Sequence, residues 1–125
     1  MKIKTSELKG AALDWAVLEA TGFFKGYTQF RSGKNFLKVY GVARSKHLHP
    51  STDWSQGGPI IEREEISLHT TPKFAAQCMK WDASQRNING ACVRSQFGPT
   101  PLIAAMRCYC SAELGDEVDV PEELK

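Results

Sequence analysis

The stretch from Gly98 to Gly115 constrains the fold more than any other part of the sequence. Thr100 is a favoured N-cap residue, and Pro101 fixes the backbone angle that the first helical position needs. Gly115 suits the position just past the end of a helix. These signals predict a helix over residues 101–114. Its apolar side chains cover most of the circumference, so the helix must be buried by the rest of the fold or by a second subunit.

A second helix is predicted over residues 7–20, where apolar side chains recur at helical spacing. Thr5 or Ser6 would cap its first turn, and Gly22 would end it. Gly10 is an unfavourable residue inside a helix, which we attribute to a close packing contact or to a frayed first turn.

Short strands are predicted where apolar and polar residues alternate, at 1–4, 23–31, 36–43, 66–70, 78–83 and 117–120. The last of these can pair with the first. Pro59 follows two glycines and predicts a short helix that begins there. Two principal helices with these strands indicate an α+β fold with a small mixed or antiparallel sheet. We expect residues 1–125 to form a single domain.

The composition, with 42% hydrophobic and 24% charged residues, is that of a folded globular protein. No apolar run approaches the ~20 residues that a membrane helix needs, and the first residues lack the apolar region of a secretory signal. We therefore expect a cytosolic protein with no membrane partner. Reduced thiols are expected at the four cysteines, which lack metal-site spacing: Cys78, Cys92, Cys108 and Cys110.

The sequence contains no motif of a serine hydrolase, a zinc protease or a P-loop enzyme. No histidine is positioned by the sequence to activate a cysteine. We therefore assign no catalytic residue, no metal ligand and no cofactor, and we expect a protein that binds without performing chemistry.

The most distinctive loop surrounds Trp54. An indole face stacks on flat ligands, and Asp53 and Gln56 beside it can hydrogen-bond to a ligand edge. Gly57 and Gly58 would let backbone N–H groups approach an anion at the start of the predicted helix. The alternative interpretation is that Trp54 anchors the loop in the core and that the two glycines form a tight turn.

The start of the last helix offers a second anion site. Gly98 and Thr100 precede it, and helix N-termini favour phosphates and carboxylates. Arg107 is a charged residue on an otherwise apolar helix and must find an anion or solvent. That anion is either a ligand phosphate or an internal carboxylate, with three candidates: Asp14, Asp53 and Glu62.

Aromatic and cationic residues interleave over residues 23–46. Single-strand nucleic-acid binders combine these residue types, but so does any amphipathic hairpin. Strand alternation would place Lys38 on the same face as Phe36 and Tyr40, which breaks a stacking platform. We therefore do not expect nucleic-acid binding, and we retain this segment as a possible surface for a host protein.

Several segments of the sequence resemble the NinX-like family of small accessory phage proteins: 5–10, 12–17, 51–64, 81–83, 98–107 and 115–121. The resemblance does not extend to residues 23–50 and 84–97. It implies action in the cytosol of an infected bacterium and gives no reaction. Accessory phage proteins often act against host defence, by binding a host protein or by sequestering a nucleotide signal.

We hypothesise that the chain captures a small anionic, nucleotide-like ligand, as a homo-oligomer, in a counter-defence role. Trp54 would stack on the base, and Arg107 would neutralise the phosphate. The expected ligand-binding residues are Asp53, Trp54, Gln56, Gly57, Gly58, Gly98, Thr100 and Arg107. The alternative is an inhibitor of a host protein that uses the aromatic-rich region 23–50.

Overall fold

The computed structural model describes residues 2–21, 49–72, 76–86 and 92–120. The strands expected within 23–43 lie outside these residues. The described elements are β1 (Lys2–Lys4), a 3-10 helix (Thr5–Glu7), α1 (Gly10–Thr21), α3 (Trp54–Arg63), β2 (Ser67–Thr70), a second 3-10 helix (Gln77–Met79), β3 (Trp81–Arg86), β4 (Cys92–Gly98), α4 (Pro101–Leu114) and β5 (Glu117–Asp119).

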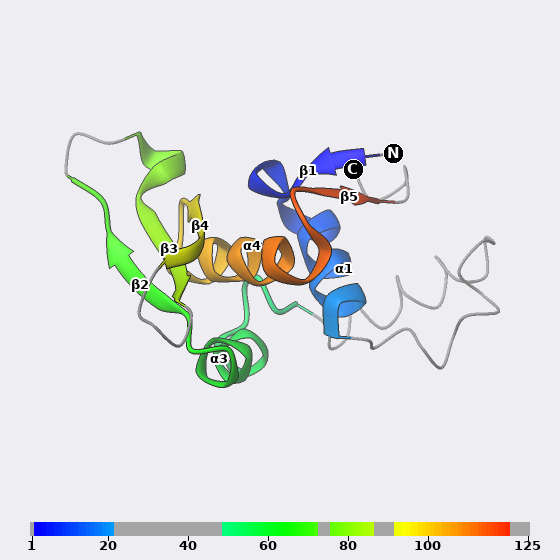
Figure 1. Cartoon of the computed structure of the whole chain (residues 1–125), viewed down its shortest axis with the longest axis horizontal. Helices are drawn as coiled ribbons and strands as arrows, with labels where there is room; N and C mark the ends of the chain where they lie inside the picture. The colour runs from blue at the N-terminus through cyan, green and yellow to red at the C-terminus, as the bar shows by residue number, and fades with distance from the viewer. Residues whose placement is uncertain (1, 22–48, 73–75, 87–91, 121–125) are drawn as a thin grey trace, which may run out of the picture.

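Helix α4 lies at the centre of the molecule (Figure 1). The antiparallel sheet β2-β3-β4 packs on one side of it, α1 and the antiparallel pair β1-β5 lie on the other, and α3 packs across it near its beginning. This arrangement confirms the α+β class. Within the described residues, the strands form two separate antiparallel sheets, of two and three strands, rather than one.

The sequence signals around α4 are confirmed. The Thr100 hydroxyl accepts a hydrogen bond from the Ile103 amide at 3.1 Å, and Pro101 is the first helical residue. Gly115 ends the helix with a φ of 89°, a conformation that glycine adopts without strain. Nine residues of α4 are buried by other elements of the same chain. Of the two alternatives, burial by the rest of the fold therefore accounts for this helix, and the homo-oligomer stays a prediction.

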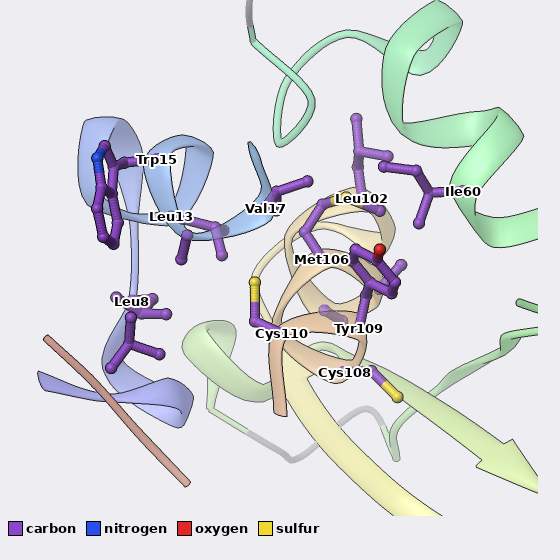
Figure 2. Close-up of a cluster of buried hydrophobic side chains, with 14 of the residues drawn as sticks. Leu8, Leu13, Trp15, Val17, Ile60, Leu102, Met106, Cys108, Tyr109 and Cys110 are labelled. Carbon is purple, nitrogen blue, oxygen red and sulfur yellow. The ribbon is translucent and has the colours of Figure 1, made fainter. Parts of the chain in front are cut away.

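Side chains of α4 point in several directions into the core (Figure 2). Leu102 lies beside Ile60 of α3, Cys108 points toward the three-stranded sheet, and Cys110 points toward α1. Burial raises the pKa of the Cys110 thiol far above its ordinary value. This thiol is therefore a packing group rather than a nucleophile.

The predicted start of the first helix is wrong. Helix α1 begins at Gly10, whose φ of 56° favours glycine, and no atom lies within 4 Å of the position of an added Cβ. The residue is therefore needed for its backbone angle and not for a packing contact. Thr5 does not cap the helix. Its hydroxyl donates to the Gly115 carbonyl at 2.6 Å, and its amide donates to the Asp116 carbonyl at 2.8 Å.

The predicted pairing of the two terminal strands is confirmed. Ile3 of β1 lies opposite Val118 of β5 in an antiparallel register. On either side of this pair a lysine faces an acidic residue, which favours the register. Together with the bonds of Thr5, the pairing fastens the N-terminal segment to the end of α4.

Two further boundaries differ from the predictions, and one strand was missed. The helix expected to begin at Pro59 begins five residues earlier, at Trp54. The strand expected over 78–83 begins at Trp81, because residues 77–79 form a 3-10 helix. Strand β4 was not predicted at all. It pairs with β3, has a register irregularity, and leads directly into α4.

Candidate functional site

A small open pocket lies where α3 and α4 begin. Its volume is about 210 Å³, and the residues that line it come from both helix starts: Ser51, Thr52, Trp54, Thr100, Pro101, Leu102 and Ile103. The two loop-to-helix segments that the sequence suggested as separate anion sites therefore meet at one place. Trp54 and Thr100, both expected site residues, line this pocket.

Trp54 is the first residue of α3, and 53% of its surface is exposed. The alternative that it anchors the loop in the core is therefore wrong. A large exposed aromatic side chain on a pocket wall is available to stack on a flat ligand.

Asp53 and Gln56 shape the start of α3. The Asp53 carboxylate accepts hydrogen bonds from the Ser55 amide at 2.9 Å and the Ser55 hydroxyl at 2.7 Å. These bonds lower the pKa of Asp53. The Gln56 side chain donates to Asp53 at 3.1 Å and accepts from the His49 amide at 2.8 Å. The side chains of Asp53 and Gln56, which we expected to bind the edge of a ligand, thus form hydrogen bonds within the protein. These bonds hold the first turn of α3, which carries the pocket residue Trp54.

The two glycines after Gln56 lie inside α3 and not at its beginning. The Gly57 amide donates to the Asp53 carbonyl at 2.9 Å, so a helix bond already uses it. A Cβ on Gly57 would lie 2.5 Å from Leu102 Cδ1 and 2.5 Å from the Pro50 carbonyl oxygen. Gly57 therefore permits the close approach of α3 to α4. Gly58 has open space around it.

Gly98 has a similar packing role on the other side of α4. A Cβ on Gly98 would lie 2.7 Å from the backbone nitrogen of Ala104, so only glycine lets β4 approach the helix this closely. Thr100 caps the helix twice, since its hydroxyl takes the Ile103 amide and its carbonyl takes the Ala104 amide at 3.1 Å. Because Pro101 has no N–H, little donor capacity remains at this helix start.

Arg107 does not line the pocket. Its Nε donates to the Leu8 carbonyl at 2.7 Å, and its Nη1 donates to the Phe97 carbonyl at 2.8 Å. Only 9% of the residue is exposed, and burial lowers the pKa of the guanidinium, which nevertheless stays charged. In the described part of the chain it forms no ion pair, so the alternative of a bridge to an internal carboxylate is wrong. Arg107 joins the N-terminal segment to β4.

Ser51 is a pocket residue that the sequence analysis did not select. It is 2% exposed, and its amide donates to the Asp14 carboxylate on α1 at 2.9 Å. Asp14 itself is 1% exposed. No local pattern marks Ser51, because its burial depends on an aspartate 37 positions away in the chain.

The described residues contain no group of three His, Cys, Asp or Glu side chains that could hold a metal ion. Among the same residues, no helix is long and apolar enough to cross a membrane.

The fold and the pocket define a small α+β protein built around one buried helix, with an aromatic-walled pocket where two helices begin. The chain belongs to the family described as bacteriophage P22 NinX, whose model matches residues 4–112. The match runs through residues 23–50 and 84–97, which the resemblance seen in the sequence left out. A search of curated proteins found no match.

Proposed function

We propose that this phage protein binds and sequesters a small anionic, nucleotide-like ligand in the cytosol of the infected bacterium, without chemistry. One observation carries the proposal: Trp54 is half exposed on the wall of a pocket formed where two helices begin. An indole face in such a position favours stacking on a base. Removing a signalling nucleotide from the host cell would counteract a defence that depends on it.

The size of the pocket limits how much of the ligand it can hold. Its volume of about 210 Å³ is below the roughly 300–1,000 Å³ of sites that enclose a whole drug-sized ligand. We therefore propose that one ring system enters the pocket and that the phosphate stays at its mouth. The positive end of the α4 dipole favours an anion there, whereas Asp53 already occupies the start of α3.

Homo-oligomer formation is a separate proposal, which a mass measurement in solution tests independently of ligand binding.

Thermal unfolding in the presence of a panel of nucleoside monophosphates and cyclic nucleotides tests the function. A ligand that binds only the folded state stabilises it by about 2.7 kcal/mol at a hundredfold excess over Kd, which is a shift of several degrees for a domain of this size. The bound compound is then released by denaturation and identified by chromatography. Intact nucleotide would support sequestration, and an altered nucleotide would identify an enzyme instead. Absence of any shift would favour the inhibitor of a host protein that uses region 23–50.

A further inference from the structure

We propose that the Ser51 hydroxyl is a specificity-determining group, which hydrogen-bonds to the edge of a heterocyclic base in the pocket. The ligand would then be recognised through its base rather than through its phosphate. This inference rests on the proposed function and adds to it the part of the nucleotide that is selected.

The position of Ser51 carries the inference. The residue lines the pocket although it is 98% buried, and the bond from its amide to the Asp14 carboxylate fixes its backbone. In the described residues the only hydrogen bond of Ser51 is this one, made by the amide, so the hydroxyl is left without a partner. This hydroxyl is not among the fully buried polar atoms that lack a partner in the described residues, so it is open to solvent at the pocket. A ligand atom can therefore replace water as the hydrogen-bond partner of this hydroxyl.

The surroundings of the hydroxyl favour a flat, uncharged group. Facing the loop that carries Ser51 are Pro101, Leu102 and Ile103, and Trp54 supplies an aromatic surface. A phosphate placed among these groups would lose its hydration without gaining a cation, because the Arg107 guanidinium lies elsewhere and donates to two carbonyls. A base keeps its ring on the apolar surface and presents donors and acceptors at its edge. A hydroxyl can pair with either.

The test compares three probes by calorimetry on the full chain: the nucleoside monophosphate that gives the largest thermal shift, its nucleoside, and ribose 5-phosphate. We expect the nucleoside to bind within about tenfold of the nucleotide, and ribose 5-phosphate to bind far more weakly than either. Ribose 5-phosphate binding as tightly as the nucleotide, with no binding of the nucleoside, would overturn the inference and leave the proposed function intact. If no nucleotide or nucleoside binds, both proposals fail.

Ser51→Ala tests the residue itself. It removes the hydroxyl and keeps the backbone amide that bonds to Asp14. We expect affinity for the nucleotide and for the nucleoside to fall by about tenfold, which is the loss of one hydrogen bond. The matched control is Ser95→Ala, which removes an exposed hydroxyl bonded to Asp82 on the sheet, and it should leave both affinities unchanged. Equal affinities in Ser51→Ala and the wild type would overturn the inference. Should Ser51→Ala fail to fold, the three-probe comparison still decides whether the ligand is recognised through its base.

Discussion

Arg107 offers the sharpest test of how the fold is held together. Its guanidinium donates to the Leu8 carbonyl at 2.7 Å and to the Phe97 carbonyl at 2.8 Å, so it links α4 to the segment before α1 and to β4. Hydrogen bonds to charged groups contribute roughly 1.5 kcal/mol or more each. Replacing Arg107 with Ala should therefore lower the free energy of unfolding by about 3 kcal/mol. For a chain of 125 residues this corresponds to a fall in Tm of roughly 10–15 °C.

Urea denaturation followed by circular dichroism measures the loss, and Arg107→Lys is the matched control. A lysine keeps the charge but lacks the planar fork that reaches two carbonyls at once, so we expect about half of the loss. A free energy of unfolding for Arg107→Ala within about 0.5 kcal/mol of the wild type would refute the structural role. Unchanged stability together with abolished nucleotide binding would instead restore the phosphate-binding role suggested by the sequence.

Three further predictions follow from the packing and the charges. Gly98→Ala places a Cβ 2.7 Å from an α4 backbone nitrogen and should lower the free energy of unfolding by about 1–3 kcal/mol. Gly58→Ala has open space inside α3 and should raise the free energy of unfolding by roughly 0.5–1 kcal/mol. Equal Tm values for the two variants would contradict the contact geometry. The hydrogen bonds of Ser55 lower the pKa of Asp53 in the folded state, so its cap stabilises α3 above the unfolded pKa of about 4 and loses this effect as pH falls through the folded value. The Tm difference between wild type and Asp53→Asn should accordingly change below pH ~4, and a constant difference would contradict it. Iodoacetamide should modify exposed Cys78 in the native protein but leave buried Cys110 unmodified until the chain unfolds; peptide mass mapping shows the order, and early modification of Cys110 would contradict the core assignment.

Local sequence signals predicted those elements whose ends are determined locally. The cap at Thr100, the proline at 101 and the glycine at 115 bracket α4, because each acts on its own helix end. The alternation over 117–120 likewise predicted β5 and its pairing with β1. These features depend on residues close together in sequence or on a simple two-residue period.

At the start of α3 the sequence offers two helix-start signals, and the prediction used the wrong one. Pro59 was interpreted as a first helical residue, but it lies inside a helix that Asp53 caps. The spacing of Asp53 and Gln56, an N-cap residue followed three positions later by an amide, is the signature that would have identified the correct start.

The partners of Arg107 and Ser51 could not be predicted from the sequence. Arg107 bonds to carbonyls of Leu8 and Phe97, which are 99 and 10 positions away, and backbone carbonyls carry no sequence signature. Ser51 is buried through a contact with Asp14 on α1. Both positions follow from how α1, β4 and the α3 loop pack around α4, which is decided by tertiary structure.

The central claim is that Trp54 binds the ligand, and it is tested most directly by comparing Trp54→Ala with Phe97→Ala. Both changes remove a large exposed aromatic side chain, but only the first removes a wall of the pocket. Calorimetry with the nucleotide that most stabilises the wild type measures both affinities. We predict that Trp54→Ala loses roughly 5- to 150-fold in affinity, since base–aromatic stacking contributes about 1–3 kcal/mol. Its Tm without ligand should stay close to that of the wild type, and Phe97→Ala should bind normally. Wild-type affinity in Trp54→Ala would contradict the account.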